Sequence, residues 1–299
     1  RPRAPGLLGA HGRQPVGAGR GSKLLKDGGK ARPTFPARLP AASPSPALRP
    51  SVARVSQPPL ASVKPVPRPA IKTAPVVRPS VPSGVGMDSS AVRAAMVRKI
   101  QAQGVSHPGV LAALQAVERH RFVDSALVNQ AYEDTSLPIG LGQTISKPGV
   151  VARMIELLCA SQAGKLGRVL EIGTGCGYQA AVLAHVAREV YSIERLRGLH
   201  EKARENLRAF RISNLHLLFG DGMVGYAKGA PYAAIIAAAG GNDIPQAWID
   251  QLAVGGRLVA PAVTAAGQQN LVVVDKTATG IVRTELEAVF FVPLKSGIA

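Results

Sequence analysis

The fold of this chain is decided by the segment Val169-Leu170-Glu171-Ile172-Gly173-Thr174-Gly175-Cys176-Gly177-Tyr178. A short apolar run ends at an acidic residue and is followed by three alternating glycines. A strand that passes through glycines into a helix brings backbone N–H groups and a helix N-terminus close to a ligand, because no Cβ atoms intervene. This segment therefore predicts a strand, a turn and a helix start beside a site for a polar small molecule.

The flanking sequence alternates between short apolar strands and amphipathic helices, which is typical of an α/β fold with a mostly parallel twisted sheet and helices on both faces. Strands are predicted at 168–172, 189–193, 215–219, 233–238 and 257–261. Helical periodicity covers 89–118, with a break between Gly104 and Pro108, and returns after Pro148, at about 195–209 and at about 246–252. Residues 119–147 are loop-like, and 271–274 with 281–289 predict an antiparallel edge hairpin.

Polar groups follow three of these strands. The glycines follow Ile172, Glu194 ends the second strand, and Asp221 follows the third. Ligands of open α/β sheets bind beyond the carboxyl ends of the strands, where such groups converge. Glu194 lies 21 positions after Gly173, close to the spacing of roughly 20 residues at which an acid reaches ribose hydroxyls. The sequence thus predicts a nucleoside ligand, the alternative being that these acids are solvated loop residues.

Glu171 narrows the choice of nucleoside. A carboxylate beside the glycine loop would repel a pyrophosphate, but it suits a ligand that carries an ammonium and a sulfonium, as S-adenosylmethionine does. Asp221 would suit the adenine end, where a carboxylate or its neighbouring backbone can meet the exocyclic amine. These residues favour S-adenosylmethionine as the cofactor.

Residues 1–88 differ from the rest of the chain. They hold 15 Lys or Arg against 2 Asp, 17 of the 24 prolines, and Phe35 as their one aromatic residue. Such a segment buries too little apolar surface to offset its ordering entropy, so it is predicted to be a disordered extension, with the folded domain at 89–299. It is either a dispensable solvated extension or a basic tail for nucleic acid or anionic surfaces. The first methionine, Met87, also allows it to be upstream translated sequence.

The two cysteines, Cys159 and Cys176, lack partner histidines at ligand spacing, which argues against a disulfide scaffold or a zinc site. No apolar stretch reaches the roughly 18 residues of a membrane span. A cytoplasmic protein, acting as a monomer without a membrane partner, is expected.

The chain resembles the protein-L-isoaspartate O-methyltransferases over about residues 89–297. Beside the glycine loop, the motifs that carry the resemblance are Phe122-Val123, Leu137-Pro138-Ile139-Gly140, Gly142-Gln143-Thr144-Ile145-Ser146, Val151-Ala152-Arg153-Met154, Ser192-Ile193-Glu194-Arg195, Gly220-Asp221-Gly222, Ile244-Pro245-Gln246, Gly255-Gly256-Arg257-Leu258 and Phe291-Val292-Pro293-Leu294. Thr144-Ile145-Ser146 is specific to this family rather than shared by methyltransferases generally.

The resemblance implies methyl transfer from S-adenosylmethionine to the free carboxylate of isoaspartyl residues in damaged proteins and peptides, which starts their repair. Ser146 matches the active-site serine, and about Thr135 to Pro148 should help cover the substrate. Because the carboxylate is already ionised, Ser146 would orient it rather than act as a nucleophile; a helix N-cap role for Ser146 is the alternative. The cofactor-binding residues are expected to be Thr144, Ile145, Glu171, Gly173, Thr174, Gly175, Gly177, Glu194, Arg195, Asp221 and Gly222.

The chain departs from the family pattern at three places. Ala233 stands where an aspartate is usual, residues 236–241 lack a polar residue and a proline, and Gly149 replaces a bulkier residue. These changes could loosen the substrate loop. They leave open a second function, a catalytically weakened S-adenosylmethionine-binding protein whose basic tail recruits RNA or another acidic partner.

Overall fold

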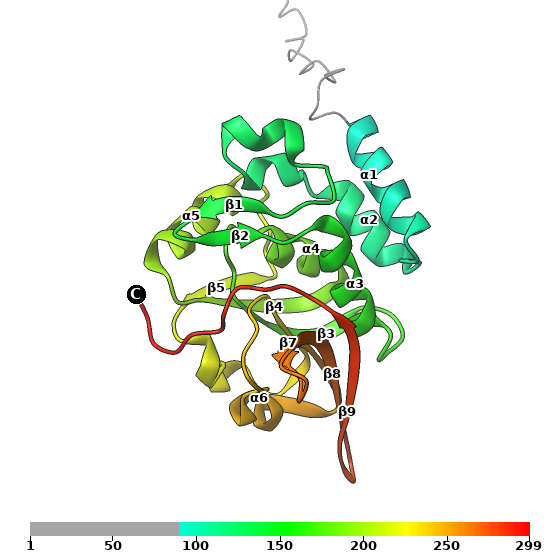
Figure 1. Ribbon diagram of the computed structural model, residues 1–299, viewed down its shortest axis with the longest axis vertical. Helices are drawn as coiled ribbons and strands as arrows, with labels where there is room; N and C mark the ends of the chain where they lie inside the picture. The colour runs from blue at the N-terminus through cyan, green and yellow to red at the C-terminus, as the bar shows by residue number, and fades with distance from the viewer. Residues whose placement is uncertain (1–89) are drawn as a thin grey trace, which may run out of the picture. The chain divides into compact units, whose positions relative to one another are not determined.

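The computed structural model describes residues 90–299 (Figure 1). The extension predicted at 1–88 lies outside these residues. Within them, seven strands form one sheet in the order β5-β4-β3-β6-β7-β8-β9. Its strands are β3 (Leu166–Ile172), β4 (Ala187–Glu194), β5 (Leu215–Phe219), β6 (Tyr232–Ala237), β7 (Leu252–Val263), β8 (Gln269–Thr277) and β9 (Gly280–Ala288).

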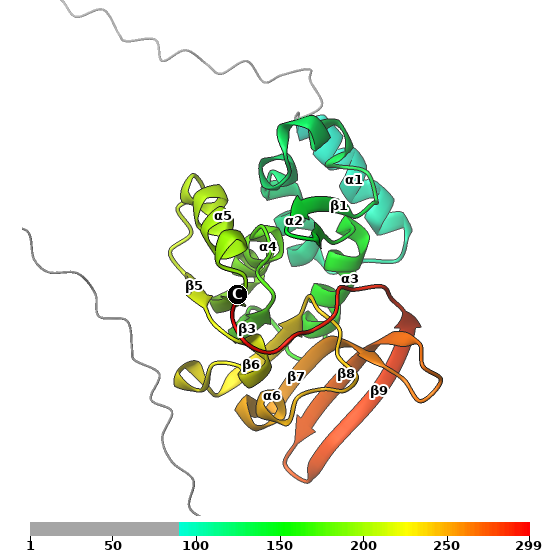
Figure 2. The same ribbon diagram turned by 60° about the vertical axis from the view of Figure 1, so that its left-hand side comes forward.

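The strand pairing confirms the predicted topology. Strands β3 to β7 run parallel, whereas β8 pairs antiparallel with β7 and β9. The predicted edge hairpin is therefore present, at the end of the sheet seen in Figure 2. β7 begins five residues earlier than expected, at Leu252. Its first residues include Gly255 and Gly256, which mask the apolar alternation of a strand.

Helices cover both faces of the sheet (Figures 1 and 2). Val169 and Val190 point into one apolar cluster with helices on its outer side, while Leu170 and Ile235 point into a second cluster on the opposite face. This alternation follows from the two-residue period of a strand. The first cluster also holds residues of α1 (Ser90–Ala102), α2 (Pro108–Ala116), α3 (Pro148–Cys159), α4 (Tyr178–Val186) and α5 (Arg197–Arg208).

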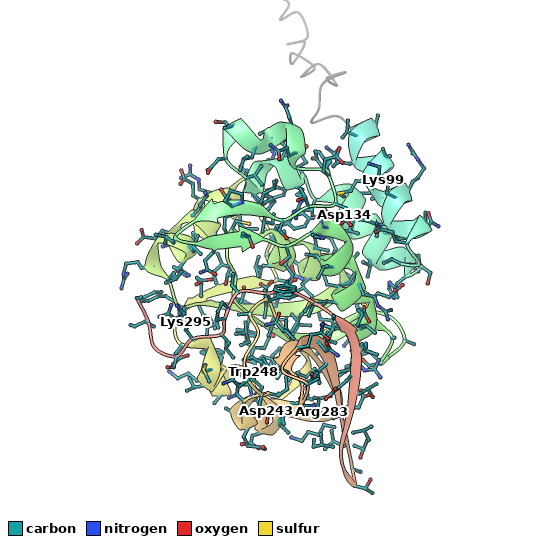
Figure 3. All side chains as sticks on the ribbon, in the orientation of Figure 1. Lys99, Asp134, Asp243, Trp248, Arg283 and Lys295 are labelled. Atoms are coloured by element: carbon teal, nitrogen blue, oxygen red, sulfur yellow. The ribbon has the colours of Figure 1, made fainter. Side chains whose placement is uncertain are left out.

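The second face carries the short helix α6 (Gln246–Gln251), whose Trp248 is 1% exposed (Figure 3). The Trp248 indole N–H donates to the Gly222 carbonyl oxygen at 2.8 Å. This bond ties α6 to the 3-10 turn Gly222–Val224 that follows β5. α6 on the second face thus supports the turn after β5, next to Asp221.

The interpretation of 119–147 as a loop is wrong. This segment holds the 3-10 turns Arg119–Phe122 and Ser125–Gln130 and a separate two-stranded antiparallel sheet of β1 (Leu137–Gly140) and β2 (Gln143–Ile145). Strands of four and three residues are too short to show a periodicity in sequence. The turn between them has positive φ at Gly140, Leu141 and Gly142. The small sheet brings the family-specific Thr144-Ile145-Ser146 segment close to the carboxyl ends of β3 and β4.

Across residues 90–299, no helix combines the length and the apolar character needed to cross a membrane.

Candidate functional site

The glycine loop joins β3 to α4 as the sequence predicts. Gly173, Gly175 and Gly177 have φ values of 88°, 57° and 94°, a region that L side chains rarely adopt. The Gly173 and Thr174 N–H groups donate to the Ile193 carbonyl oxygen at 2.9 and 3.2 Å. The loop is thereby fixed against the end of the neighbouring strand β4.

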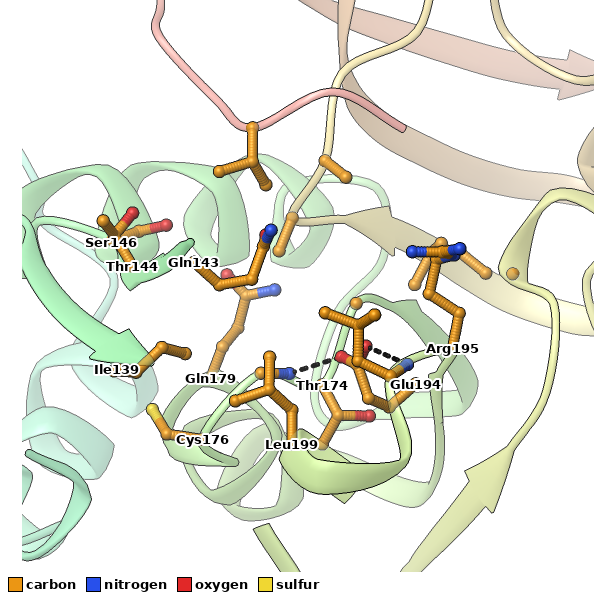
Figure 4. Close-up of a pocket in the computed structure, with 18 of the residues that line it drawn as sticks. Ile139, Gln143, Thr144, Ser146, Thr174, Cys176, Gln179, Glu194, Arg195 and Leu199 are labelled. Carbon is orange, nitrogen blue, oxygen red and sulfur yellow. Dashed lines mark hydrogen bonds between the residues drawn. The ribbon is translucent and has the colours of Figure 1, made fainter. Parts of the chain in front are cut away.

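A cavity of ≈ 230 Å³ lies beyond this loop, at the carboxyl ends of β3 and β4 (Figure 4). The residues expected to bind ligand that line it are Thr144, Ile145, Ser146, Gly173, Thr174, Gly175, Glu194, Arg195 and Gly222. Glu171, Gly177 and Asp221 do not line it. The structure therefore brings most, but not all, of the expected residues to one cavity.

Glu194 is fixed in the cavity wall by backbone donors. Its Oε2 accepts from the Gly175 N–H at 2.9 Å and its Oε1 from the Leu196 N–H at 2.9 Å (Figure 4). The side chain is 95% buried, with 5% exposed. A carboxylate has lone pairs beyond these two bonds. They are available to hydroxyl donors of a ribose at the position that the strand-end spacing predicts.

Glu171 lies below the cavity rather than in its wall. Its side chain is fully buried and accepts a hydrogen bond from the Ser192 hydroxyl, which in turn lies 2.6 Å from the Thr174 hydroxyl. Oε1 has no hydrogen-bond partner among the described residues. Burial raises the pKa of the Glu171 carboxyl to about 8. Glu171 does not line the cavity in this structure, so its expected contact with the cofactor stays a prediction.

Asp221 is engaged by the chain itself. Its Oδ1 accepts from the Met223 N–H at 2.8 Å and its Oδ2 from the Gly297 N–H at 2.7 Å. The next residue, Gly222, reaches the cavity instead. A Cβ on Gly222 would lie 2.6 Å from Ile172 Cγ2, so only glycine fits there without rearrangement.

Gly177 has a packing role in this structure. A Cβ built on it would lie 2.8 Å from Leu207 Cδ1 and 3.5 Å from Ala203 Cβ. Its absence lets α4 begin directly against α5. The third glycine of the loop thus serves helix packing, while Gly173 and Gly175 border the cavity.

Ser146 and Thr144 lie across the cavity from Glu194 (Figure 4). The N-cap residue of α3 is Lys147, and its side chain makes no capping hydrogen bond. The alternative interpretation of Ser146 as a plain N-cap is therefore wrong. The segment that carries Ser146 faces the same space as the glycine loop.

Several cavity residues were missed by sequence reasoning. They are Ile139, Leu141, Gln143, Val151, Ile172, Cys176, Tyr178, Gln179, Ile193, Leu196, Leu199, Ala238, Ala239, Val292, Pro293, Leu294 and Lys295. Gln143 and Val292 to Leu294 lie within quoted family motifs, which is the signal that could have found them. The C-terminal segment is held by the Gly240 N–H, which donates to Val292 O at 2.9 Å, and by the Leu294 N–H, which donates to Gly240 O at 2.8 Å.

The departures from the family pattern fall in different surroundings. Ala233 lies at the start of β6, five residues and about 16 Å before Ala238 in the cavity wall, so it is remote from the substrate segment. Gly149 leaves room for Asp134, whose Oδ1 accepts its N–H at 3.0 Å; a Cβ there would lie 3.0 Å from the same oxygen. A Cβ on Gly240 would lie 2.1 Å from the Gln269 side-chain nitrogen and 3.1 Å from Pro261 Cβ.

This parallel sheet, with a glycine loop after one strand and a fixed carboxylate after the next, defines a Rossmann-like, S-adenosylmethionine-dependent methyltransferase. The protein-L-isoaspartate(D-aspartate) O-methyltransferase family matches residues 91–299, and the chain belongs to that family.

Individual relatives agree with this family assignment. A protein-L-isoaspartate O-methyltransferase of Methylibium petroleiphilum is 65% identical over 223 residues, which cover 74% of this chain and 83% of the relative. One of Leptothrix cholodnii is 55% identical over 271 residues, covering 89% of this chain and 95% of the relative. The second alignment is longer than residues 90–299 and so extends into the N-terminal region.

Solved structures agree in fold. A protein-L-isoaspartate O-methyltransferase superposes with a TM-score of 0.62 at 28% identity, over 69% of this chain and 67% of that chain. A beta-aspartate methyltransferase from Plasmodium falciparum, in complex with S-adenosyl-L-homocysteine, superposes with a TM-score of 0.59 at 23% identity. It covers 67% of this chain and 97% of that chain, and this likeness concerns the fold alone.

Proposed function

We propose that this protein transfers a methyl group from S-adenosylmethionine to the free carboxylate of isoaspartyl residues in damaged proteins and peptides, and so starts their repair. One observation carries the proposal. The segment Thr144-Ile145-Ser146 and the glycine loop with Glu194 line opposite sides of one cavity. A donor held on one side and a carboxylate held on the other would meet between them.

The residues present fit the cofactor. Gly173 and Gly175 leave backbone exposed to the cavity, and Glu194 offers acceptors at the ribose position. Glu171 carries an unpaired, buried carboxyl oxygen below the loop, where a nearby cation would favour its ionised form. When bound, S-adenosylmethionine supplies a methyl group on a sulfonium that is already a good leaving group.

This methyl transfer needs few catalytic groups from the protein. The acceptor carboxylate is ionised near pH 7, so no strong base is required. We propose that Ser146 orients the carboxylate or the adjoining backbone by a hydrogen bond. The C-terminal residues Val292, Pro293 and Leu294 line the cavity and limit the access of water. Rate enhancement then comes mainly from positioning two reactants in line.

A paired-peptide assay tests the proposal. Purified protein and labelled S-adenosylmethionine are mixed with matched isoaspartyl and aspartyl peptides. We expect label in the isoaspartyl peptide alone, whereas equal labelling of both, or of neither, would refute the proposed substrate. Cofactor binding without transfer would favour the weakened binding protein, whose basic tail lies outside the described residues.

Two serine variants test the role of Ser146. Ser146→Ala should lower isoaspartyl turnover and leave S-adenosyl-L-homocysteine binding unchanged. Ser136→Ala is the matched control, because Ser136 is exposed in the same segment and does not line the cavity. Unchanged turnover by Ser146→Ala would contradict its assignment to the substrate.

We also propose a cytoplasmic setting. Cys159 and Cys176 are both buried and unpaired, and burial raises the pKa of each thiol to about 11. Such thiols are unreactive and fit a reducing compartment.

A further inference from the structure

A completely buried arginine lies directly behind the substrate segment. Arg119 is 0% exposed and stands at the start of the 3-10 turn Arg119–Phe122. Its Nε donates to the Ala131 carbonyl oxygen at 2.8 Å, and its Nη2 donates to the Ser146 carbonyl oxygen at 2.7 Å. A longer contact of 3.5 Å joins Nη2 to the Thr135 carbonyl oxygen. One guanidinium thus binds backbone at both ends of the segment 131–146.

The same guanidinium touches the other side of the site. Its Cζ lies 4.7 Å from the ring centroid of Tyr178, the first residue of α4 after the glycine loop. Tyr178 lines the cavity, whereas Arg119 does not. Arg119 therefore lies one layer behind the cavity and contacts both the substrate segment and the start of the helix that follows the glycines.

Burying the Arg119 guanidinium costs free energy, which suggests that this side chain does more than fill space. A buried cation loses several kcal/mol of hydration, and no carboxylate among residues 90–299 forms an ion pair with Arg119. Its charge is met by carbonyl dipoles and an aromatic face instead. Only the planar fork of an arginine presents several fixed donors to separate carbonyls at once. The geometry is that of a clamp on the backbone of Ser146.

We propose that Arg119 is a positioning residue for methyl transfer, which fixes the backbone of Ser146 so that its hydroxyl faces the substrate carboxylate. The inference rests on the proposed assignment of Ser146 to the substrate. Because Arg119 donates to the Ser146 carbonyl oxygen itself, loss of this bond should change the backbone position of Ser146 first. The positive charge of the Arg119 guanidinium behind the cavity also favours an anionic group in front of it.

The test is a double-mutant cycle. Arg119→Lys keeps the charge but loses the fork, and Arg119→Met removes both; each is combined with Ser146→Ala. Arg168→Lys is the matched control, since Arg168 also binds a carbonyl, that of Gly229, and lies 5.9 Å from an aromatic ring at the opposite end of β3. The readouts are kcat and KM for an isoaspartyl peptide and the Kd of S-adenosyl-L-homocysteine.

We expect Arg119→Lys to lower kcat/KM for the peptide by about tenfold, the effect of one lost hydrogen bond to a charged group, with the Kd of S-adenosyl-L-homocysteine changed by less than about twofold. In the Ser146→Ala background the same change should lower kcat/KM by less than about threefold, because coupled residues lose their effects together. Arg168→Lys should leave both readouts unchanged.

Four results would overturn the proposal. A parallel fall in cofactor affinity and peptide turnover would make Arg119 a general support of the fold, as would an undiminished effect in the Ser146→Ala background. Normal turnover by Arg119→Lys, together with impaired turnover by Ser146→Ala, would refute the role of Arg119 and leave that of Ser146 standing. Normal turnover by Ser146→Ala would refute the assignment of Ser146 on which it rests. If Arg119→Met does not fold, Arg119→Lys decides the matter.

Discussion

Replacing Glu171 by glutamine should change how the stability of this protein depends on pH. The Glu171 carboxyl is fully buried, and burial raises its pKa from 4.5 to about 8. The folded protein therefore keeps a proton that the unfolded chain loses between these values. The stability associated with this proton is fully present below pH 4.5 and is lost as the pH rises towards 8. Glu171→Gln removes the titration but keeps the shape of the side chain.

The magnitude follows from the width of that pH window. One proton contributes about 1.4 kcal/mol to the free energy of unfolding per pH unit. Between pH 4.5 and about 8, the free energy of unfolding of the wild type should fall by about 5 kcal/mol relative to that of Glu171→Gln. The glutamine amide oxygen can still accept the Ser192 hydrogen bond. Any cost of the substitution that does not vary with pH shifts the difference in unfolding free energy by a constant and leaves its pH slope unchanged.

Urea unfolding of the cofactor-free protein between pH 5 and 9 measures this difference. Glu205→Gln is the matched control, because Glu205 is exposed on α5. A difference between wild type and Glu171→Gln that does not vary from pH 5 to 8 would refute the reasoning, since Glu171 would then ionise alike in both states.

Three further substitutions test the cavity wall and its supports. Glu194→Gln should weaken S-adenosyl-L-homocysteine binding by about tenfold in calorimetry, because a charged acceptor is lost; unchanged affinity would remove Glu194 from the site. Gly177→Ala should lower the free energy of unfolding by about 2 kcal/mol, since alanine is strained at φ 94° and its Cβ would meet Leu207; an equally stable variant in urea unfolding would contradict this. Trp248→Phe loses the bond to Gly222 and should cost about 2 kcal/mol by the same measurement, and no loss would show that the bond is dispensable.

Much of the main sheet was predictable because its signals are local. Apolar runs such as 169–172 and 215–219 alternate with amphipathic helices, and each pattern is read from neighbouring residues alone. The glycine loop and Glu194 were predictable for the same reason, since each follows directly from the end of a strand.

The small sheet β1-β2 and the clamp by Arg119 were not predictable in this way. Arg119 meets Ser146 across 27 residues of sequence, and the two strands that precede Ser146 are too short for a periodicity. The engagement of Asp221 by Gly297 joins residues 76 positions apart. No local pattern encodes such contacts.

The sequence by itself determined the alternating strands and helices of the main sheet, the glycine loop and some of the residues that could meet a nucleoside cofactor. Only the tertiary structure decided which of them face the cavity. Glu171 and Glu194 are both buried acids at strand ends, yet Glu171 does not line the cavity and burial raises its pKa, whereas Glu194 lies in the cavity wall between two backbone donors. The reason is physical: hydration and hydrogen-bond partners are set by every segment packed around a carboxyl, and most of those segments are distant in the chain.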